Sequence, residues 1–590
     1  MTLSILGKHW TLAEAKRAAA LAQGLALPEV VARVLAVRQP QAEVTELLHF
    51  LTPKLTHLPD PLHLVEMEAA VQRLTHAITH GEQLAIFGDY DVDGACASAF
   101  LLRYFRALGS NPVLYVPDRL TEGYGPNPAA MEKLAAAGVK LIVTVDCGST
   151  AHAALERAQA LGMDVIVTDH HQAPLPLPPC VALVNPNRVD ETSPCTMLCG
   201  AGMAFFLAMA TSRTLRTQNF FTPERKEPDL RHWLDLIAVA TIADMVPLVG
   251  VNRVLVHFGM QVLNRWGNAG LAALAQVASK NNTLPVANGY TVGFQLGPRI
   301  NAAGRLAEST LGATLLSMDD PAAALDLATR LDKLNTTRQE VQAEVLELAL
   351  RDAEAQAHEP AIVLAGSGWH AGVVGIVAAR VKEQFHRPTF VLAVGEEGTA
   401  TGSGRSITGV DLGRAVHACM PTLIRGGGHG MAAGVTVKTE NIAAFTVALR
   451  AHIQQQVAGV ENPFTPQLRI DGMVQPATLT ETFLSTLNQL EPYGTGHAEP
   501  TFALCGVTLA DCRSVGATGA HLKLRLQGAD GTNIEAIAFG AGDNALGGFF
   551  SQNRGQHISV AGHARLNTYM GRSKPDVQVA DAHLGTWLSQ

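Results

Sequence analysis

Three aspartates crowd into the segment LAIFGDYDVDGACAS, residues 84–98, as Asp89, Asp91 and Asp93. They directly follow a short apolar run of the kind that forms a buried strand. Carboxylates so close together repel one another unless a positive charge lies between them. The spacing therefore indicates a site for a cation.

Similar residues follow three later apolar runs. Asp146 follows LIVTV, the triplet DHH at 169–171 follows DVIVT, and Asp244 ends LIAVATIAD. In an open parallel sheet, ligands bind beyond the carboxyl ends of the strands, so these side chains would converge. Carboxylates with one or two histidines suit Mn²⁺ or Mg²⁺ better than zinc. Two such ions, roughly 3.5–4 Å apart, can clamp a phosphate and activate a water.

A simpler interpretation exists for each of these residues alone. One aspartate at a strand end is more often a helix cap or a turn residue. Acidic or imidazole groups recur, however, after four separate apolar runs. This recurrence favours a metal site over four unrelated caps.

The elements that would position these residues alternate between strand and helix. Apolar runs predict strands at 84–87, 112–116, 141–145 and 164–168, with helical patterns near 97–107, 127–137 and 151–161. Buried strands that alternate with helices favour a doubly wound parallel sheet.

The second half of the chain has a different pattern. Residues 321–357 predict one helix, which Asp320 can cap and Pro321 can begin. Its length, about 55 Å at 1.5 Å per residue, is typical of a helix that bridges two domains. An α/β pattern then restarts at 360–366, and from about residue 465 short alternating strands suit a small β-barrel.

Composition places the chain among globular proteins. It is 47% apolar and 16% charged, with a net charge of −8. No apolar run approaches the roughly 18 residues of a membrane span, and the N-terminus lacks the apolar core of a secretion signal. The eight scattered cysteines suit a reducing compartment. We therefore expect a cytoplasmic protein without a membrane segment.

Longer motifs resemble the DHH phosphoesterase family. DHH at 169–171 is the signature that names this family, and GDYDVDG (88–94) matches its first motif. Within the family, the chain is similar to the bacterial exonucleases specific for single-stranded DNA, over nearly its whole length. The segments that carry this similarity are PDRLTEGYG (117–125), GPRINAAGRL (297–306), GWHAGVVGIVAAR (368–380), GSGRSI (402–407), GGGHGMAAG (426–434) and PYGTGHAEPTF (492–502).

The resemblance implies an α/β fold. A parallel-sheet DHH domain would be joined by the long helix to a smaller α/β DHH-associated domain, followed by a C-terminal OB-type β-barrel. The expected parts are an N-terminal helical extension (1–64), the DHH catalytic domain (65–320), the connecting helix (321–358), the DHH-associated domain (359–460) and the OB-fold domain (465–590).

The resemblance also implies roles for the acidic edge. Asp89 would be an alternate metal ligand, and His171 would contact the scissile phosphate or help to protonate the leaving oxygen. We expect two ions, Mn²⁺ or Mg²⁺. The positions that match the family's metal ligands are Asp91, Asp93, Asp146, His170 and Asp244.

Ten further positions are expected to bind substrate. Four of them resemble the family's pocket for a 5′-terminal phosphate, namely Arg119, Tyr124, Ser403 and Arg405. The other six would clamp the backbone, stack on a base or ribose, or donate from a glycine-rich turn, and they are Arg299, Asn301, Arg305, Trp369, His370 and His429. The competing interpretations are an interdomain salt bridge for the three residues of 299–305, core packing for Trp369, and a simple tight turn for the glycine-rich segments.

The activity that the resemblance implies is a metal-dependent 5′→3′ exonuclease. It would degrade single-stranded DNA to 5′-mononucleotides in DNA repair and recombination, as a monomer that works with a single-strand-binding protein and a helicase. One alternative is a DHH phosphodiesterase for short oligonucleotides or cyclic dinucleotides. Another is a non-catalytic replication scaffold. The predicted barrel argues against the first alternative, and the intact ligand set argues against the second.

Overall fold

The computed structural model describes residues 3–118, 121–279, 283–306, 308–516, 518–569 and 572–587. Its contacts divide the chain into two compact units. Unit 1 comprises Met1–Pro40, Thr336–Thr486 and Pro500–Gln590, and unit 2 comprises Gln41–Asn335 and Leu487–Glu499.

Unit 2 is built on a five-stranded parallel sheet in the order β3-β2-β4-β5-β6. Its four expected strands are confirmed to within a residue or two. The strands are β2 (Leu84–Gly88), β3 (Val113–Tyr115), β4 (Leu141–Val145), β5 (Asp164–Thr168) and β6 (Ala182–Val184).

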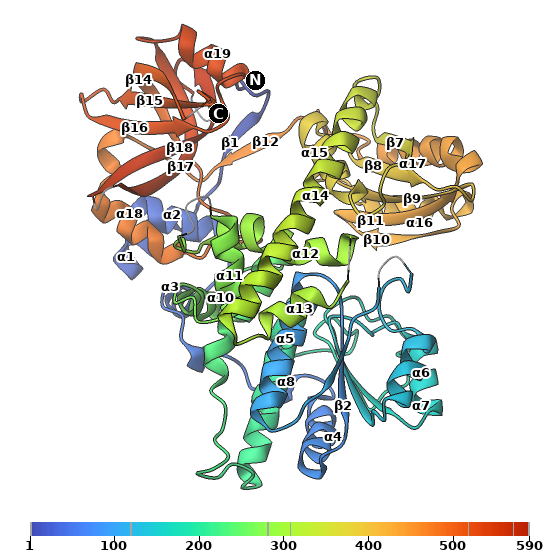
Figure 1. The fold of residues 1–590 in the computed structure, drawn as a ribbon. Helices are drawn as coiled ribbons and strands as arrows, with labels where there is room; N and C mark the ends of the chain where they lie inside the picture. The colour runs from blue at the N-terminus through green and yellow to red at the C-terminus, as the bar shows by residue number, and fades with distance from the viewer. Residues whose placement is uncertain are drawn as a thin grey trace. The chain divides into compact units, whose positions relative to one another are not determined.

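Helices cover both faces of this sheet (Figure 1). Alternate strand residues, such as Ile86 and Phe87, belong to two separate cores on opposite faces. The predicted doubly wound sheet is therefore confirmed. One face carries α4 (Met67–His80), α5 (Val92–Ala107) and α8 (Gly200–Thr217), and the other carries α6 (Pro128–Ala136) and α7 (His152–Ala160).

The strand register brings the candidate site together. Gly88 pairs with Val145, and Val145 pairs with Thr168, so the last residues of β2, β4 and β5 lie in one row. The residues that follow them leave the sheet at the same edge. Sequence-distant side chains therefore meet there because the parallel strands end in register.

Unit 2 contains further helices, most of which extend the core beside α5 and α8. They are α3 (Val44–Leu51), η1 (Leu55–His57), η2 (Pro61–His63), η3 (Leu230–Trp233), α9 (Leu234–Ala243), α10 (Gly250–Leu263), α11 (Ala269–Ala278), η4 (Thr291–Leu296), α12 (Gly297–Leu306) and α13 (Leu311–Leu316).

The predicted long helix is α14 (Pro321–Glu354), which ends three residues before the expected position. The Asp320 carboxylate accepts a hydrogen bond from the Ala322 N–H at 2.9 Å, as a cap should. The helix begins in unit 2 and continues into unit 1.

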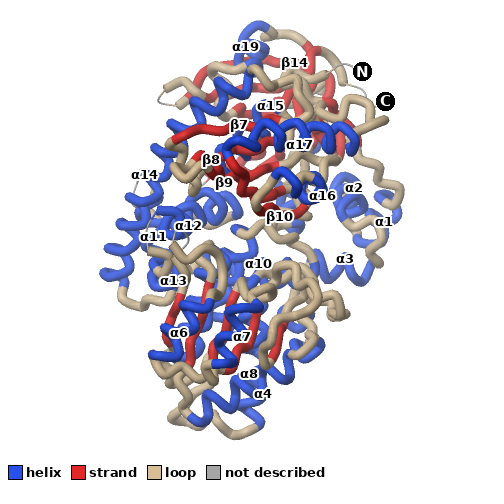
Figure 2. The backbone as a smooth tube through the Cα atoms, turned by 90° about the vertical axis from the view of Figure 1, so that its right-hand side faces the viewer, coloured by secondary structure: helices blue, strands red, loops and turns tan. Residues whose placement is uncertain are grey.

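Unit 1 contains a mixed sheet in the order β10-β11-β9-β8-β7. One face packs on α14 and α15, and the other on α16 and α17, which lie over the strands in Figure 2. This arrangement confirms the second α/β pattern. The elements are β7 (Ile362–Ser367), α15 (Val374–Phe385), β8 (Thr389–Val394), β9 (Thr399–Arg405), α16 (Leu412–Ala418), η5 (Met420–Thr422), β10 (Arg425–His429), β11 (Ala432–Lys438), η6 (Thr439–Asn441) and α17 (Ile442–Gln456).

The C-terminal part of unit 1 is the predicted β-barrel. Strands run in the order β14-β15-β16-β18-β17, and pairing of β14 with β17 closes the barrel. The elements are β12 (Gln467–Ile470), β13 (Gly472–Val474), η7 (Pro476–Thr478), α18 (Glu481–Leu487), η8 (Asn488–Leu490), β14 (Phe502–Val515), β15 (His521–Gln527), β16 (Asn533–Ala538), α19 (Ala545–Gln552), β17 (His557–Tyr569) and β18 (Arg572–Leu584).

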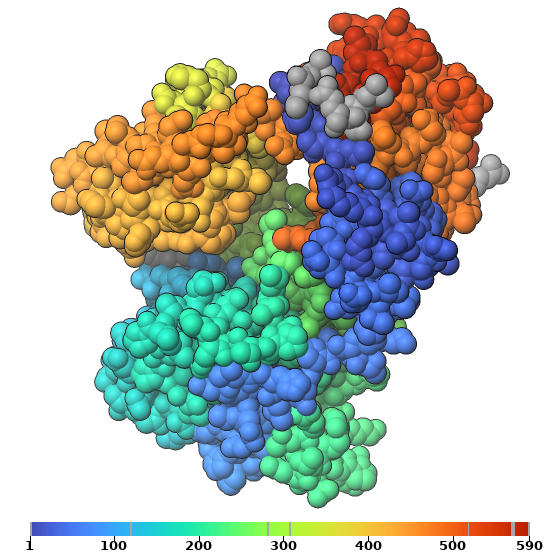
Figure 3. Space-filling view, turned by 180° about the vertical axis from the view of Figure 1, so that it is seen from behind, coloured from blue at the N-terminus to red at the C-terminus, as the bar shows by residue number. Residues whose placement is uncertain are grey.

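The first residues of the chain pack on this barrel (Figure 3). Helices α1 (Ala18–Leu25) and α2 (Glu29–Arg38) match the expected helical character, but β1 (His9–Leu12) is a strand that pairs in parallel with β12. The indole of Trp10 donates to the buried Asp581 carboxylate at 3.0 Å. The pattern of short helices gave no sign of this distant pairing.

Among the residues described, no single helix is long and apolar enough to cross a membrane. The bent pair α1 and α2 passes the same test on length and composition alone.

A buried arginine holds a distant segment in unit 2. Arg253 is 2% exposed and donates to the carbonyl oxygens of Leu490 at 3.0 Å, Glu491 at 2.9 Å and Phe50 at 2.9 Å. Its guanidinium also lies 3.6 Å from the ring centroid of Phe50. These bonds explain why residues 487–499 pack with unit 2.

His497 lies in the same segment and is fully buried. Its Nε2 lies 2.7 Å from the Leu490 carbonyl oxygen. Burial, and then the positive charge of Arg253, lower the pKa of His497 to about 4. A histidine held neutral in this way costs the folded state stability once the pH is low enough for the unfolded histidine to bind a proton.

We predict that this histidine makes unit 2 acid-sensitive. The pKa of His497 is about 4 in the folded state and near 6.5 in the unfolded state. His497 therefore costs no folding stability above pH 6.5, and the free energy of unfolding falls as the pH falls from 6.5 toward 4. At pH 5 the loss is about 2 kcal/mol. His497→Asn should flatten the fall in melting temperature between pH 7 and 5, whereas the exposed control His232→Asn should not. Equal slopes for both variants would contradict the prediction.

Candidate metal centre

The first turn of α5 supplies two carboxylates to the shared edge. Asp91 caps the helix, and its carboxylate accepts a hydrogen bond from the Gly94 N–H at 3.0 Å. Asp93 is 1% exposed, and its two oxygens accept from the Gly200 N–H at 2.5 Å and the Ala201 N–H at 2.8 Å. The start of α8 thus offsets part of the charge of Asp93. Asp91 serves as a cap as well as a candidate ligand.

Asp146 and His170 form the centre of the cluster. Asp146 is 1% exposed and lies in the left-handed backbone region at φ 60°. The Nε2 atom of His170 lies 3.0 Å from Oδ1 of Asp146 and 3.6 Å from one oxygen of Asp93 and one of Asp244. One imidazole nitrogen therefore faces three carboxylates. Asp89, 4% exposed, completes a second group with Asp91 and Asp146.

The electrostatics of the cluster disfavour bare carboxylates. Burial and then the neighbouring carboxylates raise the pKa of Asp146 well above its usual range, and burial raises the pKa of Asp93. Burial and the same neighbours raise the pKa of Asp244 to about 8. Cations among these groups would remove that cost.

The donor atoms fit divalent cations. Both carboxylate oxygens of Asp146 and the Nε2 atom of His170 are buried without a hydrogen-bond partner. Buried polar atoms of this kind are normally satisfied, so the lack of hydrogen-bond partners here needs an explanation. Oxygen ligands with one or two imidazoles suit Mn²⁺ or Mg²⁺. The groups whose ligand atoms lie within 4.8 Å of one another are Asp146, His170 and His171; Asp93, His170 and Asp244; and Asp89, Asp91 and Asp146.

His171 lies at the open side of the cluster and is half-exposed. Its Nδ1 lies 2.8 Å from the Asp169 carboxylate and 3.4 Å from the hydroxyl of Tyr124. Burial lowers the pKa of His171, but the hydrogen bond and the charge of Asp169 outweigh it and raise that pKa to about 9. The Tyr124 hydroxyl also donates to the main-chain oxygen of Asp146 at 3.3 Å. Tyr124 thus lies beside the cluster, and its role as a substrate contact stays a prediction.

Sequence reasoning missed the network that orients the DHH triplet. Asp169 accepts hydrogen bonds from the N–H groups of Ser149 at 3.0 Å and His170 at 2.7 Å. Asn185 donates to the main-chain oxygen of His171 at 2.8 Å, and Asn187 donates to that of His170. The signal was present, because VNPN follows the apolar residues of β6 and must leave the same sheet edge.

Asp244 depends on a turn that the 487–499 segment supports. Met245, which follows it, has φ 59°. Four residues after Asp244, the Leu248 N–H donates to the Thr495 carbonyl oxygen at 2.8 Å. A Cβ at Gly494 would come within 2.7 Å of Leu248, so the two chains approach closely there. The segment anchored by Arg253 therefore packs against the turn that carries Asp244.

Helix α12 brings three expected substrate residues beside the cluster. A Cβ at Gly304 would lie 2.8 Å from that of Tyr90, which separates Asp89 from Asp91. Arg299 donates to Asp332 at 2.8 Å and to the Gln295 oxygen at 2.7 Å, so its guanidinium already has partners within unit 2. The other two, Asn301 and Arg305, are partly exposed on the same helix.

Three other expected substrate residues share one face of the sheet in unit 1. His429 pairs with Ala432, and Ala432 pairs with Arg405, so these side chains point to the same face. Ser403 lies on that face too, and its hydroxyl accepts from Arg405 at 2.8 Å. Across the sheet, Ser403 pairs with Gly434, and Gly434 pairs with Gly427. A Cβ at either glycine would meet no atom closer than 3.9 Å.

This face has the character of an anion site. A Cβ at Gly375, in the first turn of α15, would lie 3.0 Å from the Ser403 hydroxyl and 3.1 Å from an Arg405 nitrogen. Burial lowers the pKa of Arg405, and no carboxylate of the described residues forms an ion pair with it. A helix N-terminus, a hydroxyl and an unneutralised guanidinium therefore meet there.

The remaining expected residues are less engaged. Trp369 is partly buried against the α14 and α15 core, which agrees with a packing role. The Nδ1 atom of His370 accepts from the Gly372 N–H at 3.0 Å. Arg119 lies outside the described residues.

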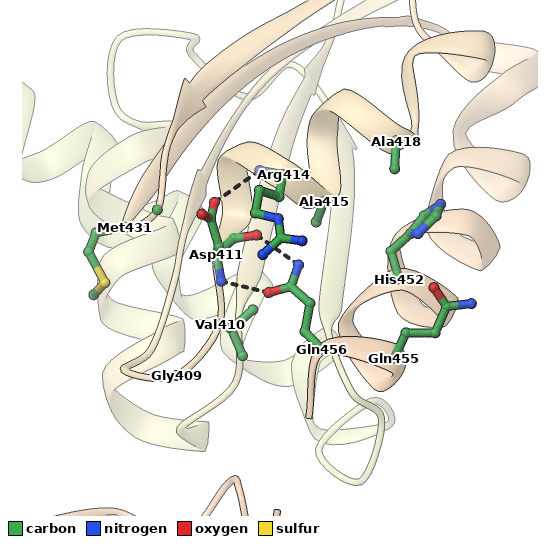
Figure 4. Close-up of a pocket in the computed structure, with 11 residues that line it drawn as sticks. Gly409, Val410, Asp411, Arg414, Ala415, Ala418, Met431, His452, Gln455 and Gln456 are labelled. Carbon is green, nitrogen blue, oxygen red and sulfur yellow. Dashed lines mark hydrogen bonds between the residues drawn. The ribbon is translucent and has the colours of Figure 1, made fainter. Parts of the chain in front are cut away.

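A separate cavity of about 640 Å³ lies beside α16 and α17 (Figure 4). Gln456 spans it, accepting from the Asp411 N–H at 2.8 Å and donating to the Asp411 carbonyl at 2.9 Å. Its lining is Gly409, Val410, Asp411, Arg414, Ala415, Ala418, Gly430, Met431, His452, Gln455 and Gln456. Nothing in it duplicates the chemistry of the acidic edge.

The fold and the acidic edge define the class as a DHH phosphoesterase. Residues 83–241 match the description "DHH family, N-terminal domain", residues 358–455 match "DHHA1 domain" and residues 470–581 match "RecJ OB domain".

Relatives along the whole chain define the family within that class. The chain is 36% identical to the single-stranded-DNA-specific exonuclease RecJ of Escherichia coli, covering 86% of this chain and 88% of the relative. It is 35% identical to that of Bacillus subtilis, covering 91% of this chain and 66% of the longer relative. The crystal structure of Thermus thermophilus RecJ with Mn²⁺ matches with a TM-score of 0.80 and 30% identity over 98% of this chain and 80% of that one. The chain belongs to the RecJ family.

A Mg²⁺ complex of the Thermus thermophilus protein matches as well, with a TM-score of 0.75 and 29% identity over 99% of this chain. Relatives with either ion are consistent with the oxygen-rich ligand set and support Mn²⁺ or Mg²⁺ as the cofactor.

We predict that Asp146 is essential for binding metal. Asp146→Asn should weaken Mn²⁺ binding at least tenfold in titration calorimetry, because it removes a buried charge that is common to two of the three ligand groups. The exposed Asp326→Asn variant on α14 is the matched control and should bind Mn²⁺ like the wild type. Unchanged Mn²⁺ affinity in a folded Asp146→Asn protein would contradict the assignment.

Proposed function

We propose that this chain hydrolyses single-stranded DNA from its 5′ end and releases 5′-mononucleotides. The observation that carries the proposal is the buried Asp146 carboxylate, unpartnered beside His170, in a chain whose relatives are named single-stranded-DNA-specific exonucleases. The closed C-terminal barrel supports a long substrate, because such barrels hold single strands.

We propose that Asp91, Asp93, Asp146, His170 and Asp244 hold the ions. When bound, divalent cations supply an activated water and neutralise the charge that develops on the phosphate. Asp169 orients His171 through its Nδ1 atom, which leaves Nε2 free to donate to a phosphate oxygen or to the leaving oxygen. Asp89, beside the ligands, is proposed as an alternate ligand.

We also propose that the Ser403 and Arg405 face of unit 1 binds a terminal phosphate. Capture of an end explains why cleavage would proceed one nucleotide at a time. His429 and the bare row of Gly427 and Gly434 would let the DNA backbone approach the sheet closely.

The proposed substrate also implies partners in the cell. Unwinding must supply the single strand, so a helicase and a single-strand-binding protein are the proposed partners in repair and recombination. All eight cysteines are free thiols, which supports a reducing compartment such as the cytoplasm. We propose that the monomer is the active form.

The direct test is digestion of a long single strand with Mn²⁺. A 3′-labelled strand should shorten progressively from its 5′ end, while a matched blunt duplex should persist. Asp93→Asn should lower the rate by at least 10³-fold, because it removes a buried ligand charge, whereas the control Asp326→Asn should digest normally. Cleavage of a dinucleotide with the long strand left intact would instead support a small-substrate phosphodiesterase. Cleavage of neither would support a scaffold.

The phosphate-binding face gives a second prediction. Arg405→Met should raise KM for a 5′-phosphorylated strand about tenfold and leave KM for a 5′-hydroxyl strand nearly unchanged, since a charge-assisted bond is lost. Arg380→Met, an exposed arginine on α15 that pairs with Glu383, is the control. An equal rise for both strands would show that Arg405 does not recognise the terminal phosphate.

A further inference from the structure

Tyr290, the N-cap residue of the π-helical turn η4, and Phe294 within that turn present their aromatic rings to solvent. Tyr290 is 63% exposed and Phe294 is 64% exposed. Their ring centroids lie 5.0 Å apart with the planes inclined by 22°, so the rings stack. A stacked pair four residues apart stabilises a helix by only about 0.2–0.5 kcal/mol. Leaving two large aromatic faces in water therefore calls for another reason.

The turn that carries these rings is firmly held. Asn264 donates to the Ala287 carbonyl at 3.2 Å and accepts from the Ala287 N–H at 2.8 Å. The indole of Trp266 donates to the Pro285 carbonyl at 3.0 Å. The Asn288 side chain accepts from the Thr291 N–H at 3.0 Å. The backbone that carries the rings is thus held in place, which lowers the entropy lost when a ligand binds.

The turn also lies against the backbone of the metal centre. Gly297, where η4 ends, donates its N–H to the Val292 carbonyl in the i→i+5 pattern of a π-helix. A Cβ at Gly297 would lie 3.8 Å from the side chains of Val92 and Ala243. Val92 stands between two proposed ligands of α5, and Ala243 directly precedes Asp244. Single π-helical turns are rare and occur frequently at functional sites.

We propose that Tyr290 and Phe294 form a platform on which bases of the DNA strand stack while one of its phosphates occupies the acidic edge. This inference rests on the proposed function and adds a binding subsite to it. The acidic edge disfavours backbone phosphates other than those that the ions hold, so uncharged contacts can add affinity there. Every base offers a π face, and stacking therefore suits an enzyme without sequence preference.

The neighbouring surface fits the same occupant. Val286 is 85% exposed and Leu284 is 48% exposed, so apolar surface continues from the rings along the segment before η4. The approach of Gly297 to Val92 and Ala243 connects this turn to the two elements that carry proposed ligands, which favours the substrate over a protein partner as the occupant.

The test compares KM and kcat for a long single strand with the Mn²⁺-loaded full chain. The double variant Tyr290→Leu with Phe294→Leu keeps apolar bulk but removes both π faces, and it should raise KM about tenfold with kcat within twofold. The exchange Tyr290→Phe with Phe294→Tyr should restore the wild-type KM. Val189→Ala, which trims a side chain that is 74% exposed elsewhere in unit 2, is the matched control and should leave both parameters unchanged.

A strand with abasic sites in place of its bases separates stacking from other contacts. It should raise the wild-type KM and abolish the difference between the wild type and the leucine double variant. A wild-type KM for that variant on normal DNA would overturn the platform. So would a difference that persists on the abasic strand, which would indicate an apolar contact other than base stacking. Failure of the wild type to cleave would refute the proposed function instead.

Discussion

Repulsion among buried carboxylates at one edge of a parallel sheet is the constraint on which the structure depends. Asp93 and Asp146 are each 1% exposed, and their neighbours are further aspartates. The fold reduces the cost in part, since the N–H groups that begin α8 donate to Asp93 and His170 faces three carboxylates. The oxygens of Asp146 still lack a hydrogen-bond donor, although His170 lies 3.0 Å from one of them. Cations would neutralise the negative charge that these contacts leave uncompensated. The carboxylates that destabilise the metal-free protein are therefore the same groups that would bind the metal.

The two units carry sites of opposite charge. Unit 2 concentrates negative charge, which attracts cations but repels a nucleic acid backbone. Unit 1 presents Arg405, Ser403 and the start of α15 beside a strip of glycines, which suits phosphate. An exonuclease needs both, because ions must reach one phosphate while the rest of a polyanion is held by other contacts. The exposed rings of Tyr290 and Phe294 offer such contacts without charge.

The sequence predicted those features that local pattern controls. Strands buried on both faces appear as continuous apolar runs, so β2, β4 and β5 were placed to within a residue, and the convergence of Asp146 with the DHH triplet followed from parallel topology. Features that depend on distant pairing were out of reach. No periodicity links β1 to β12, or Arg253 to the carbonyl of Leu490. The hydrogen bonds of Asp169 were not predicted, because the DHH triplet indicated roles only for its two histidines and the bond to Ser149 joins residues far apart in the sequence.

The account stands on cations that bind between Asp146 and His170. Anomalous diffraction from crystals soaked in Mn²⁺ tests this most directly, because it locates the ion without relying on activity. We predict strong anomalous peaks within coordination distance of the Asp146 carboxylate and the His170 Nε2 atom, with further ligands from Asp93 and Asp244. Crystals saturated with Mn²⁺ that show no peak at this edge, or peaks only at exposed surface carboxylates, would contradict the account.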